Sequence, residues 1–297
     1  MFSGSMVAIV TPMTSDGALD LPAWDRLLDF HIREGSDGIV VAGTTGESPT
    51  LTPAEVEELC VRAVARCRGK IKVIVGAGGN DTASTVARTR SLSRLGVDAV
   101  MLVTPYYNKP PQEGLYRHFA AAADAAEAPV ILYNVPTRTA VDLLPATVAR
   151  LARHPRIVGL KEATAALGRA VELVSQCPAG FAILSGEDAS AVEFIGAGAR
   201  GVISVTANVA PRRMREACAA ALTGDMALAR SLDLTLQPLH KELFIESSPI
   251  PVKWAVARMG LMGNALRLPL VQMSTAHEDA VVRAMRAAGI SLEDQAA

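Results

Sequence analysis

The sequence predicts an α/β protein, a (β/α)8 TIM barrel that continues into a C-terminal helical extension. Eight short apolar runs rich in valine and isoleucine, typical of strands buried on both faces, alternate with amphipathic segments of helical period. Such alternation specifies a parallel sheet with helical crossovers, and eight units are the number at which the sheet closes into a barrel. A doubly wound open sheet, which more often has five or six strands, is the alternative.

The predicted elements follow one another along the chain. Strands are expected at residues 7–10, 38–42, 73–75, 99–103, 130–133, 157–160, 181–184 and 201–205. Helices between them are expected at residues 22–34, 53–66, 83–95, 114–125, 145–152 and 165–175. The second helix carries clear start signals, because Thr52 suits the N-cap, Pro53 the first helical position and Glu55 a capping box.

The pattern changes after Val205. Residues 212–222, 226–243, 250–259 and 277–288 all have helical period, with no convincing strand among them. We therefore divide the chain into a barrel at residues 1–210 and a helical extension at residues 211–297. Because no low-complexity linker separates the two, we expect the extension to pack on the barrel.

Composition excludes several classes of protein. The chain has 297 residues, 50% hydrophobic and 20% charged, which is typical of a folded enzyme and not of a disordered chain. Its 29 basic and 30 acidic residues lack the basic excess that nucleic-acid binding requires. The first apolar run stops at Pro12, too short for a signal core or a membrane span, so we expect a cytoplasmic protein without a membrane partner.

Cysteine and histidine spacing bears on metals and disulfides. The four cysteines form no CxxC pair, and the five histidines are scattered without metal-ligand spacing. We therefore expect reduced thiols and no metal site.

Polar residues follow several of the predicted strands. They form segments at residues 43–48, 104–109, 133–138, 161–162 and 185–188. In a barrel of this type the carboxyl ends of the strands form one face, and that face carries the reactive residues. The sequence therefore predicts a polar ring at one end of the barrel.

Lys161, one of six lysines, directly follows the apolar run at residues 157–160. Apolar neighbours would disfavour the ammonium form, so the pKa of this amine would fall below its ordinary value of about 10.4. A neutral amine attacks carbonyl carbon, which suggests Schiff-base chemistry. The alternative is a lysine that ends a strand and extends its ammonium group outward into water.

Three neighbouring features suit an acidic substrate. The loop at residues 43–46 offers the hydroxyls of Thr44 and Thr45 and backbone amides next to glycines, which suits a carboxylate; its alternative is a simple turn before the next helix. Tyr133 suits proton relay, and Arg138 suits bidentate binding of a second carboxylate. An isolated tyrosine or arginine is, however, more often a surface or packing residue.

Four segments together resemble the signatures of the 4-hydroxy-tetrahydrodipicolinate synthase family of pyruvate-dependent class I aldolases. They are GTTGE at residues 43–47, TPYYN at 104–108, YNVPTRT at 133–139 and GLKEAT at 159–164, in order and at matching spacing. The resemblance covers nearly the whole chain, from Met1 to near Leu268.

This resemblance implies that the chain condenses pyruvate with L-aspartate 4-semialdehyde, the entry step of the diaminopimelate and lysine pathway. It also implies that Lys161 forms the imine without a cofactor and that Thr44 and Thr45 surround the pyruvate carboxylate. Protons would be relayed by Tyr133, Thr44 and Tyr107. Arg138 would bind the carboxylate of the aldehyde substrate, and Gly186 and Ile203 would line the pyruvate pocket through their backbones. The Tyr107 equivalent comes from a neighbouring subunit, and relatives are usually homotetramers built from tight dimers.

Two alternatives and one departure accompany the resemblance. One alternative is a related Schiff-base lyase acting on another 2-keto acid aldol, such as N-acetylneuraminate or 2-keto-3-deoxygluconate; N-acetylneuraminate lyases share the lysine but lack Arg138. The other is a barrel that only binds a keto acid, in which Lys161 or Tyr133 would be absent or displaced. Lysine-inhibited relatives carry ionisable residues where this chain has Pro53, Val56 and Ser84. This chain retains Ser48, Asn80 and Tyr106 as candidate regulatory residues, and we expect weak or absent inhibition by lysine.

Overall fold

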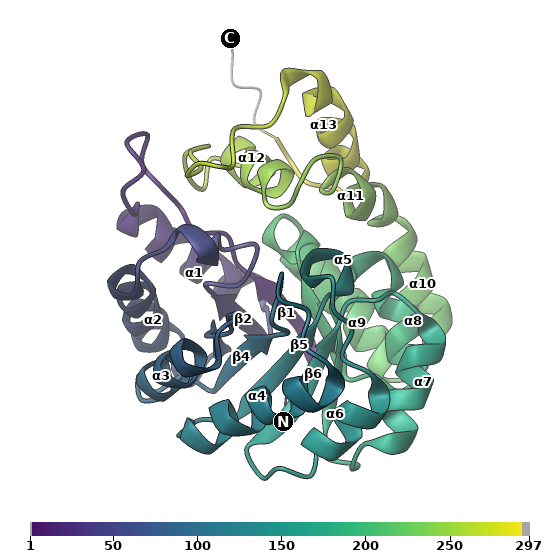
Figure 1. The fold of residues 1–297 in the computed structure, drawn as a ribbon. Coiled ribbons are helices and arrows are strands. Elements are labelled where there is room, and N and C mark those ends of the chain that lie inside the picture. Colours follow the sequence, from purple (N-terminus) through teal and green to yellow (C-terminus); the bar gives the residue numbers. More distant parts are fainter. Residues whose placement is uncertain (1, 293–297) are drawn as a thin grey trace.

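The computed structural model describes residues 2–292 and contains eight parallel strands that pair in chain order and close into a barrel (Figure 1). The strands are β1 (Gly4–Ala8), β2 (Gly38–Val41), β3 (Lys72–Gly76), β4 (Ala99–Val103), β5 (Val130–Asn134), β6 (Ile157–Glu162), β7 (Ala182–Ser185) and β8 (Gly201–Ser204). All eight predicted strands are therefore present, the barrel is confirmed, and the open sheet is wrong.

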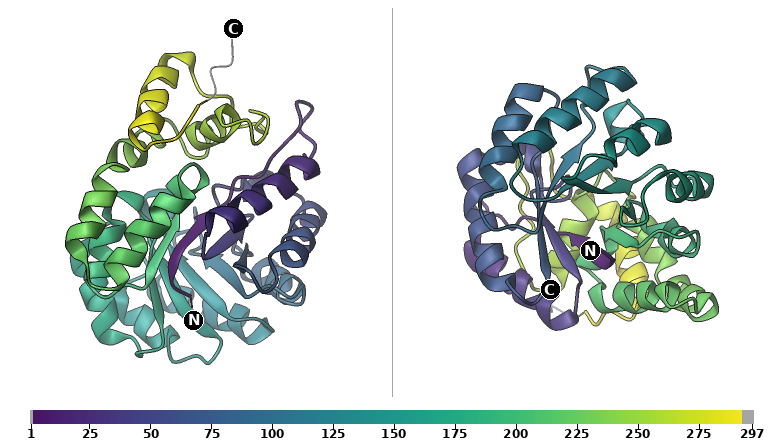
Figure 2. Two further views of the ribbon diagram at one scale, coloured as in Figure 1. Left: turned by 180° about the vertical axis from the view of Figure 1, so that it is seen from behind. Right: turned by 90° about the horizontal axis from the view of Figure 1, so that it is seen from below.

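Helices surround the strands as an outer layer, which the view from below in Figure 2 shows, and further helices lie over one end of the barrel. In chain order the helices are α1 (Leu21–Glu34), α2 (Pro53–Cys67), α3 (Thr82–Leu92), α4 (Gln112–Ala125), α5 (Pro136–Thr139), α6 (Pro145–Leu151), α7 (Leu167–Gln176), α8 (Ala191–Gly196), α9 (Pro211–Leu222), α10 (Met226–Leu234), α11 (Gln237–Glu242), α12 (Ile250–Arg258) and α13 (Glu278–Ala287). The short helices α5 and α8 were not among those predicted. The predicted capping box at Thr52 and Glu55 is present at the start of α2.

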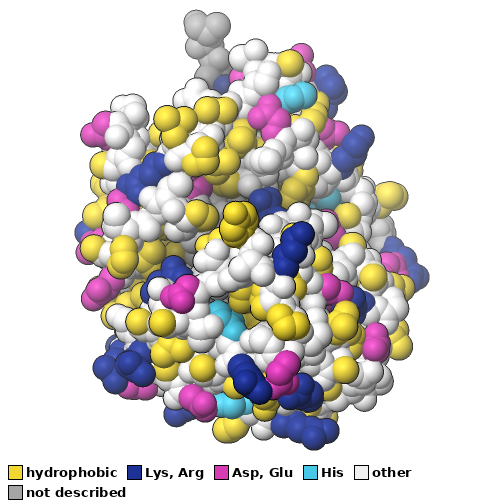
Figure 3. Space-filling model, viewed as in Figure 1, with side chains coloured by type: hydrophobic (Ala, Val, Ile, Leu, Met, Phe, Trp, Pro, Cys, Tyr) yellow, Lys and Arg dark blue, Asp and Glu magenta, His cyan; other side chains and the backbone are white. Residues whose placement is uncertain are grey.

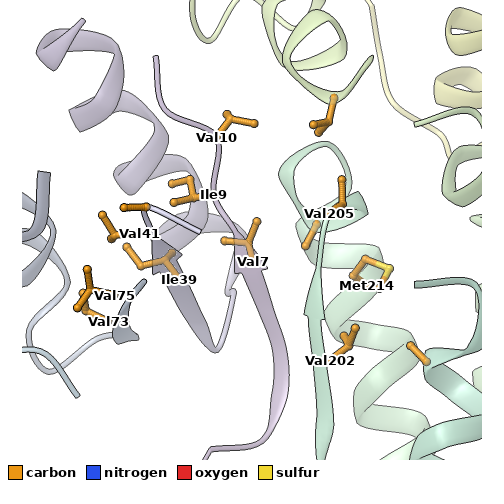
Figure 4. Packing of buried hydrophobic residues seen from close by; sticks show 14 of the residues in the cluster. Val7, Ile9, Val10, Ile39, Val41, Val73, Val75, Val202, Val205 and Met214 are labelled. Atoms are coloured by element: carbon orange, nitrogen blue, oxygen red, sulfur yellow. The ribbon is translucent and has the colours of Figure 1, made fainter. Parts of the chain in front are cut away.

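Successive side chains of each strand face alternately inward and outward, and this creates two apolar layers. The outward residues pack against the helices; Val7, Ile39, Val41, Val73, Val75 and Val202 are seen in Figure 4. The inward residues fill the barrel; they include Met6, Val40, Ile74, Ile131, Leu184 and Ile203. This alternation explains why the predicted strands read as continuous apolar runs.

The same alternation sets the direction of Lys161. Leu160 belongs to the outer layer, so the next residue along β6 faces the barrel interior. The pairing of β5 with β6 shifts by one residue, from Val130 opposite Ile157 to Ile131 opposite Gly159. Because of this bulge, Lys161 and not Leu160 lies opposite Tyr133.

The C-terminal helices continue from the barrel wall over one end of it (Figures 1 and 2). Helix α9 contacts β1 and β8, α10 contacts α8 and α9, and α13 contacts α11 and α12. The predicted single helix at residues 226–243 is wrong. Two helices replace it, and Pro238, which has no backbone N–H to donate, lies in the first turn of α11. The division of the chain at residue 210 stays a prediction.

Among residues 2–292, no helix is long and apolar enough to cross a membrane. On the face shown in Figure 3, basic and acidic side chains are interspersed.

Candidate active site

The predicted polar ring gathers at the carboxyl end of the barrel, and a cavity of about 420 Å³ opens there. Its lining includes Gly43 and Thr44 after β2, Tyr133 in β5 and Arg138 in α5. A volume in this range suits small organic ligands. Lys161, Gly186 and Ile203 are not among the lining residues. Lys161 lies against the ring of Tyr133, and Ile203 belongs to the same interior apolar cluster as Tyr133.

Lys161 is buried, with 5% of its surface exposed, and its Nζ lies 4.4 Å from the centroid of the Tyr133 ring. The ring face attracts an ammonium ion but does not accept its protons as water would. The alternative of a lysine extending into bulk solvent is therefore wrong.

Burial lowers the pKa of Lys161 to about 8. The negative charge of Asp188 opposes this shift, the guanidinium of Arg138 adds to it, and Glu187 opposes it. With that pKa, about one amine in ten is neutral at pH 7, against fewer than about one in a thousand for an ordinary lysine. Burial therefore favours the neutral form of this amine, the form able to attack a carbonyl carbon, more than exposure to water would.

Gly186 explains how the stem of Lys161 fits. A Cβ atom at this position would lie 2.7 Å from the Cβ of Ala163 and 3.0 Å from the Cε of Lys161. Any side chain there would displace the lysine, so glycine gives the stem its space.

Tyr133 is almost fully buried, and both it and Thr44 line the cavity. Burial raises the pKa of the phenol to about 12, while the charge of Arg138 and the side chain of Thr44 act in the opposite direction. Tyr133 therefore stays protonated at neutral pH. A phenol that lies near a hydroxyl and against an amine suits proton transfer between them.

The loop after β2 is a tight turn. The carbonyl of Gly43 accepts hydrogen bonds from the backbone N–H of Gly46 at 3.1 Å and of Ser48 at 3.2 Å, and the N–H of Glu47 donates to Thr44 at 3.1 Å. Thr45 is buried, whereas Thr44 is half-buried and lines the cavity. This turn places Thr44 at the cavity with Tyr133, whereas Thr45 is not among the lining residues.

Arg138 reaches the cavity from α5, a single helical turn directly after β5. Its Nη2 donates to the carbonyl of Ser248, 3.3 Å away, just before α12. The predicted guanidinium site therefore lies beside Tyr133, and the C-terminal helices help to hold it.

The remaining predicted residues divide into two groups. Ser48 and Tyr106 line the cavity, whereas Asn80 does not, and its carbonyl accepts a hydrogen bond from Asn108. Tyr107 is 89% exposed, with a φ of +76°, and it does not line the cavity of its own chain.

Sequence reasoning missed the polar residues that support the rim. Asn134 donates to both carboxylate oxygens of Glu162, and so ties together the strand ends that carry Tyr133 and Lys161. Lys253 in α12 pairs with Glu47. A lysine among the apolar residues of a buried helix requires an acidic partner, and this was the available signal for Lys253.

No group of three or more His, Cys, Asp or Glu side chains within residues 2–292 is placed to hold a metal ion.

An inward-facing amine, a phenol and a guanidinium at the carboxyl rim define a (β/α)8-barrel enzyme. The chain belongs to the dihydrodipicolinate synthetase family, whose model matches residues 1–288.

Its similarity to known members extends over almost the whole chain. It is 54% identical to the 4-hydroxy-tetrahydrodipicolinate synthase of Methylococcus capsulatus and 53% identical to that of Laribacter hongkongensis, over 98% of this chain and 100% of each relative. The crystal structure of the chloride-inhibited dihydrodipicolinate synthase of Acinetobacter baumannii with pyruvate has a TM-score of 0.96 and 45% identity, covering 98% of this chain and 100% of that one.

Proposed function

We propose that this chain condenses pyruvate with L-aspartate 4-semialdehyde to give 4-hydroxy-tetrahydrodipicolinate, through an imine on Lys161 and without a cofactor. One observation carries the proposal: the buried amine of Lys161 lies against Tyr133, with its pKa lowered to about 8. The names of the relatives support the choice of substrates.

In the first half of the reaction, neutral Lys161 attacks the keto carbon of pyruvate. Tyr133 and Thr44 move the protons that let water leave, which produces a cationic imine. Thr44 and Thr45 hold the pyruvate carboxylate. The imine draws electrons from the neighbouring methyl group, so a C–H proton is lost without a metal and an enamine forms.

In the second half, the enamine carbon forms a bond to the aldehyde carbon of the semialdehyde; the aldehyde oxygen takes up a proton and becomes the 4-hydroxyl, and the imine on Lys161 re-forms. The amino group of that substrate then adds to the imine carbon and closes the ring. Its proton passes to the nitrogen of Lys161, whose bond to carbon breaks, so that Lys161 leaves as a free amine. Arg138 binds the semialdehyde carboxylate in two parallel hydrogen bonds. Holding the carboxylates of both substrates in place lowers the entropic part of the activation free energy.

Tyr107 fits this scheme only as a contribution from another subunit. Its side chain is 89% exposed, and its neighbour Tyr106 is 41% exposed. We infer that a partner chain covers these rings and that each Tyr107 completes the proton relay of its neighbour, in a homotetramer made of two tight dimers. Gly186 and Ile203 line the pyruvate pocket in the same scheme.

Replacing Arg138 with alanine tests the substrate assignment. In a coupled assay we expect the intact protein to use aspartate semialdehyde and to reject sugar aldehydes. The Arg138→Ala variant should show a KM for the semialdehyde about tenfold to a hundredfold higher, because a charge-assisted hydrogen bond is lost. Arg138→Lys keeps the charge without the paired donors, so it should recover only part of the loss.

Pyruvate trapping by borohydride should remain intact in Arg138→Ala when it is measured at saturating pyruvate and alkaline pH. The alkaline pH matters because loss of this guanidinium lets the pKa of Lys161 rise. Equal damage to trapping and to aldehyde use would contradict the assigned role, and preferred turnover of a sugar aldehyde would contradict the proposed function.

Inhibition by L-lysine is expected to be weak or absent. Among the described residues that line the cavity, Pro53 and Val56 carry no charge, and the charged side chains are the acid Glu57 and the guanidinium groups of Arg88 and Arg138. Positive charge therefore prevails where a cationic ligand would bind. Turnover measured against rising L-lysine, with matched sodium chloride as the control, checks this; half-inhibition at sub-millimolar lysine would refute it.

A further inference from the structure

A buried ion pair joins the C-terminal helices to the loop that carries Thr44 and Thr45. The Nζ of Lys253 in α12 lies 2.5 Å from Oε1 of Glu47, and both side chains are completely buried. The second carboxylate oxygen of Glu47 accepts the backbone N–H of Arg267 at 3.3 Å. The carboxylate is thus bound from both sides by the segment that contains and follows α12.

Glu47 is in turn part of the threonine loop. Its backbone N–H donates to Thr44, and Gly46 before it accepts a hydrogen bond from Thr11 at 2.8 Å. The φ of Glu47 is +57°, a left-handed backbone conformation that residues other than glycine adopt at a cost in free energy. Contacts made elsewhere must therefore hold this residue in place, and Lys253 supplies one of them.

The segments on either side of α12 contact the same rim. Before the helix, the carbonyl of Ser248 accepts the bond from Arg138. After it, Arg267 donates to the carbonyls of Thr50 at 2.6 Å and Gly17 at 2.8 Å. Helix α12 therefore connects the loop proposed to bind one carboxylate with the arginine proposed to bind the other.

A buried ion pair suits positioning better than stabilisation. Removal of both charges from water offsets much of their attraction, so such a pair adds little stability over apolar side chains of the same size. A short charged hydrogen bond does, however, fix a narrow range of distances and angles.

We propose that Lys253 and Glu47 are positioning residues that hold the Thr44–Thr45 loop where it receives the carboxylate of pyruvate. The identity of that ligand rests on the proposed function; the ordering of the loop does not. The pair touches neither substrate.

The test uses Lys253→Met and the double variant Glu47→Gln/Lys253→Met in the full chain. The double variant keeps side chains of similar shape and removes both charges, so it leaves no unpaired buried ion. It therefore remains informative if Lys253→Met fails to fold. We expect its KM for pyruvate to rise about tenfold, because a displaced carboxylate site weakens binding, while the KM for the aldehyde stays within about twofold. Borohydride trapping should fall at low pyruvate and recover at saturation.

Hydrogen–deuterium exchange supplies a readout that needs no substrate. Amides at residues 43–50 should exchange about tenfold faster in the double variant, and those of β5 and β6 should not change. Lys72→Met/Asp98→Asn is the matched control, because it removes a lysine–carboxylate pair in which the charged atoms are 2.7 Å apart. Lys72 begins β3 at the opposite rim, so this control should leave both KM values unchanged. Phe194→Leu, at a fully buried position in α8, controls for lost stability alone.

The outcomes separate the two proposals. If the double variant loses turnover only in proportion to its folded fraction, with both KM values and loop exchange unchanged, the pair is merely structural and the inference is wrong. If the unmodified protein forms no pyruvate adduct, the proposed function fails. Hydrogen–deuterium exchange of the loop then decides the positioning role by itself: faster exchange in the double variant supports that role, and unchanged exchange overturns it.

Discussion

Replacing Lys161 with alanine is expected to abolish formation of the pyruvate adduct and to lower kcat/KM at least about a thousandfold. The reason is that this amine is the proposed nucleophile, buried against Tyr133 with a pKa lowered to about 8. In the unmodified protein the rate of trapping should rise with pH up to about 8 and then level off, because the amine is neutral above its pKa and is protonated below it.

Mass spectrometry after pyruvate and borohydride measures the adduct directly. The unmodified protein should gain one pyruvate-derived mass at Lys161, and the alanine variant none. Lys72→Ala is a suitable control, because Lys72 begins β3 at the opposite rim and pairs with Asp98. An adduct that persists in Lys161→Ala, or an unmodified mass for the intact protein, would exclude the imine mechanism.

Replacing Tyr133 with phenylalanine should lower kcat by about a hundredfold to ten-thousandfold, the range in which a positioned proton donor contributes. The ring and its contact with Lys161 would remain, so pyruvate should still be trapped at saturation, but more slowly. Phenylalanine removes only the hydroxyl, whose pKa the side chain of Thr44 lowers, so the shape of the site is kept.

Steady-state kinetics and the time course of trapping check this result. Tyr116→Phe is the matched control, because Tyr116 lies in α4, where it stacks on Arg150, and does not line the cavity. A kcat within about threefold of the unmodified protein would rule out Tyr133 as a proton relay.

The barrel was predictable because its strands are buried on both faces, and such strands are marked by short apolar runs without help from the rest of the chain. The C-terminal helices were less predictable from the sequence. The periodicity at residues 226–243 continues through the break between α10 and α11, and Pro238 in the first turn of α11 was the local sign of that break.

The candidate site residues could be named from the sequence, but their spatial arrangement could not, and their roles stay predictions. Lys161 lies opposite Tyr133 only because of the bulge between β5 and β6, and a one-residue shift in pairing leaves no mark in composition or period. Glu47 and Lys253 are 206 positions apart, so the apolar surroundings of Lys253 indicated an acidic partner but not which acid it is. The role of Tyr107 stays a prediction, because it depends on a second chain.

The pairing of β1 with β8 has a consequence for biosynthesis. Gly4 lies opposite Gly201, so the first strand gains its second neighbour only after some two hundred residues have been translated. Until then, β1 has an unpaired edge, and unpaired strand edges promote aggregation. We therefore expect truncated chains that stop short of β8 to aggregate more readily than the closed barrel, in which every strand has two neighbours.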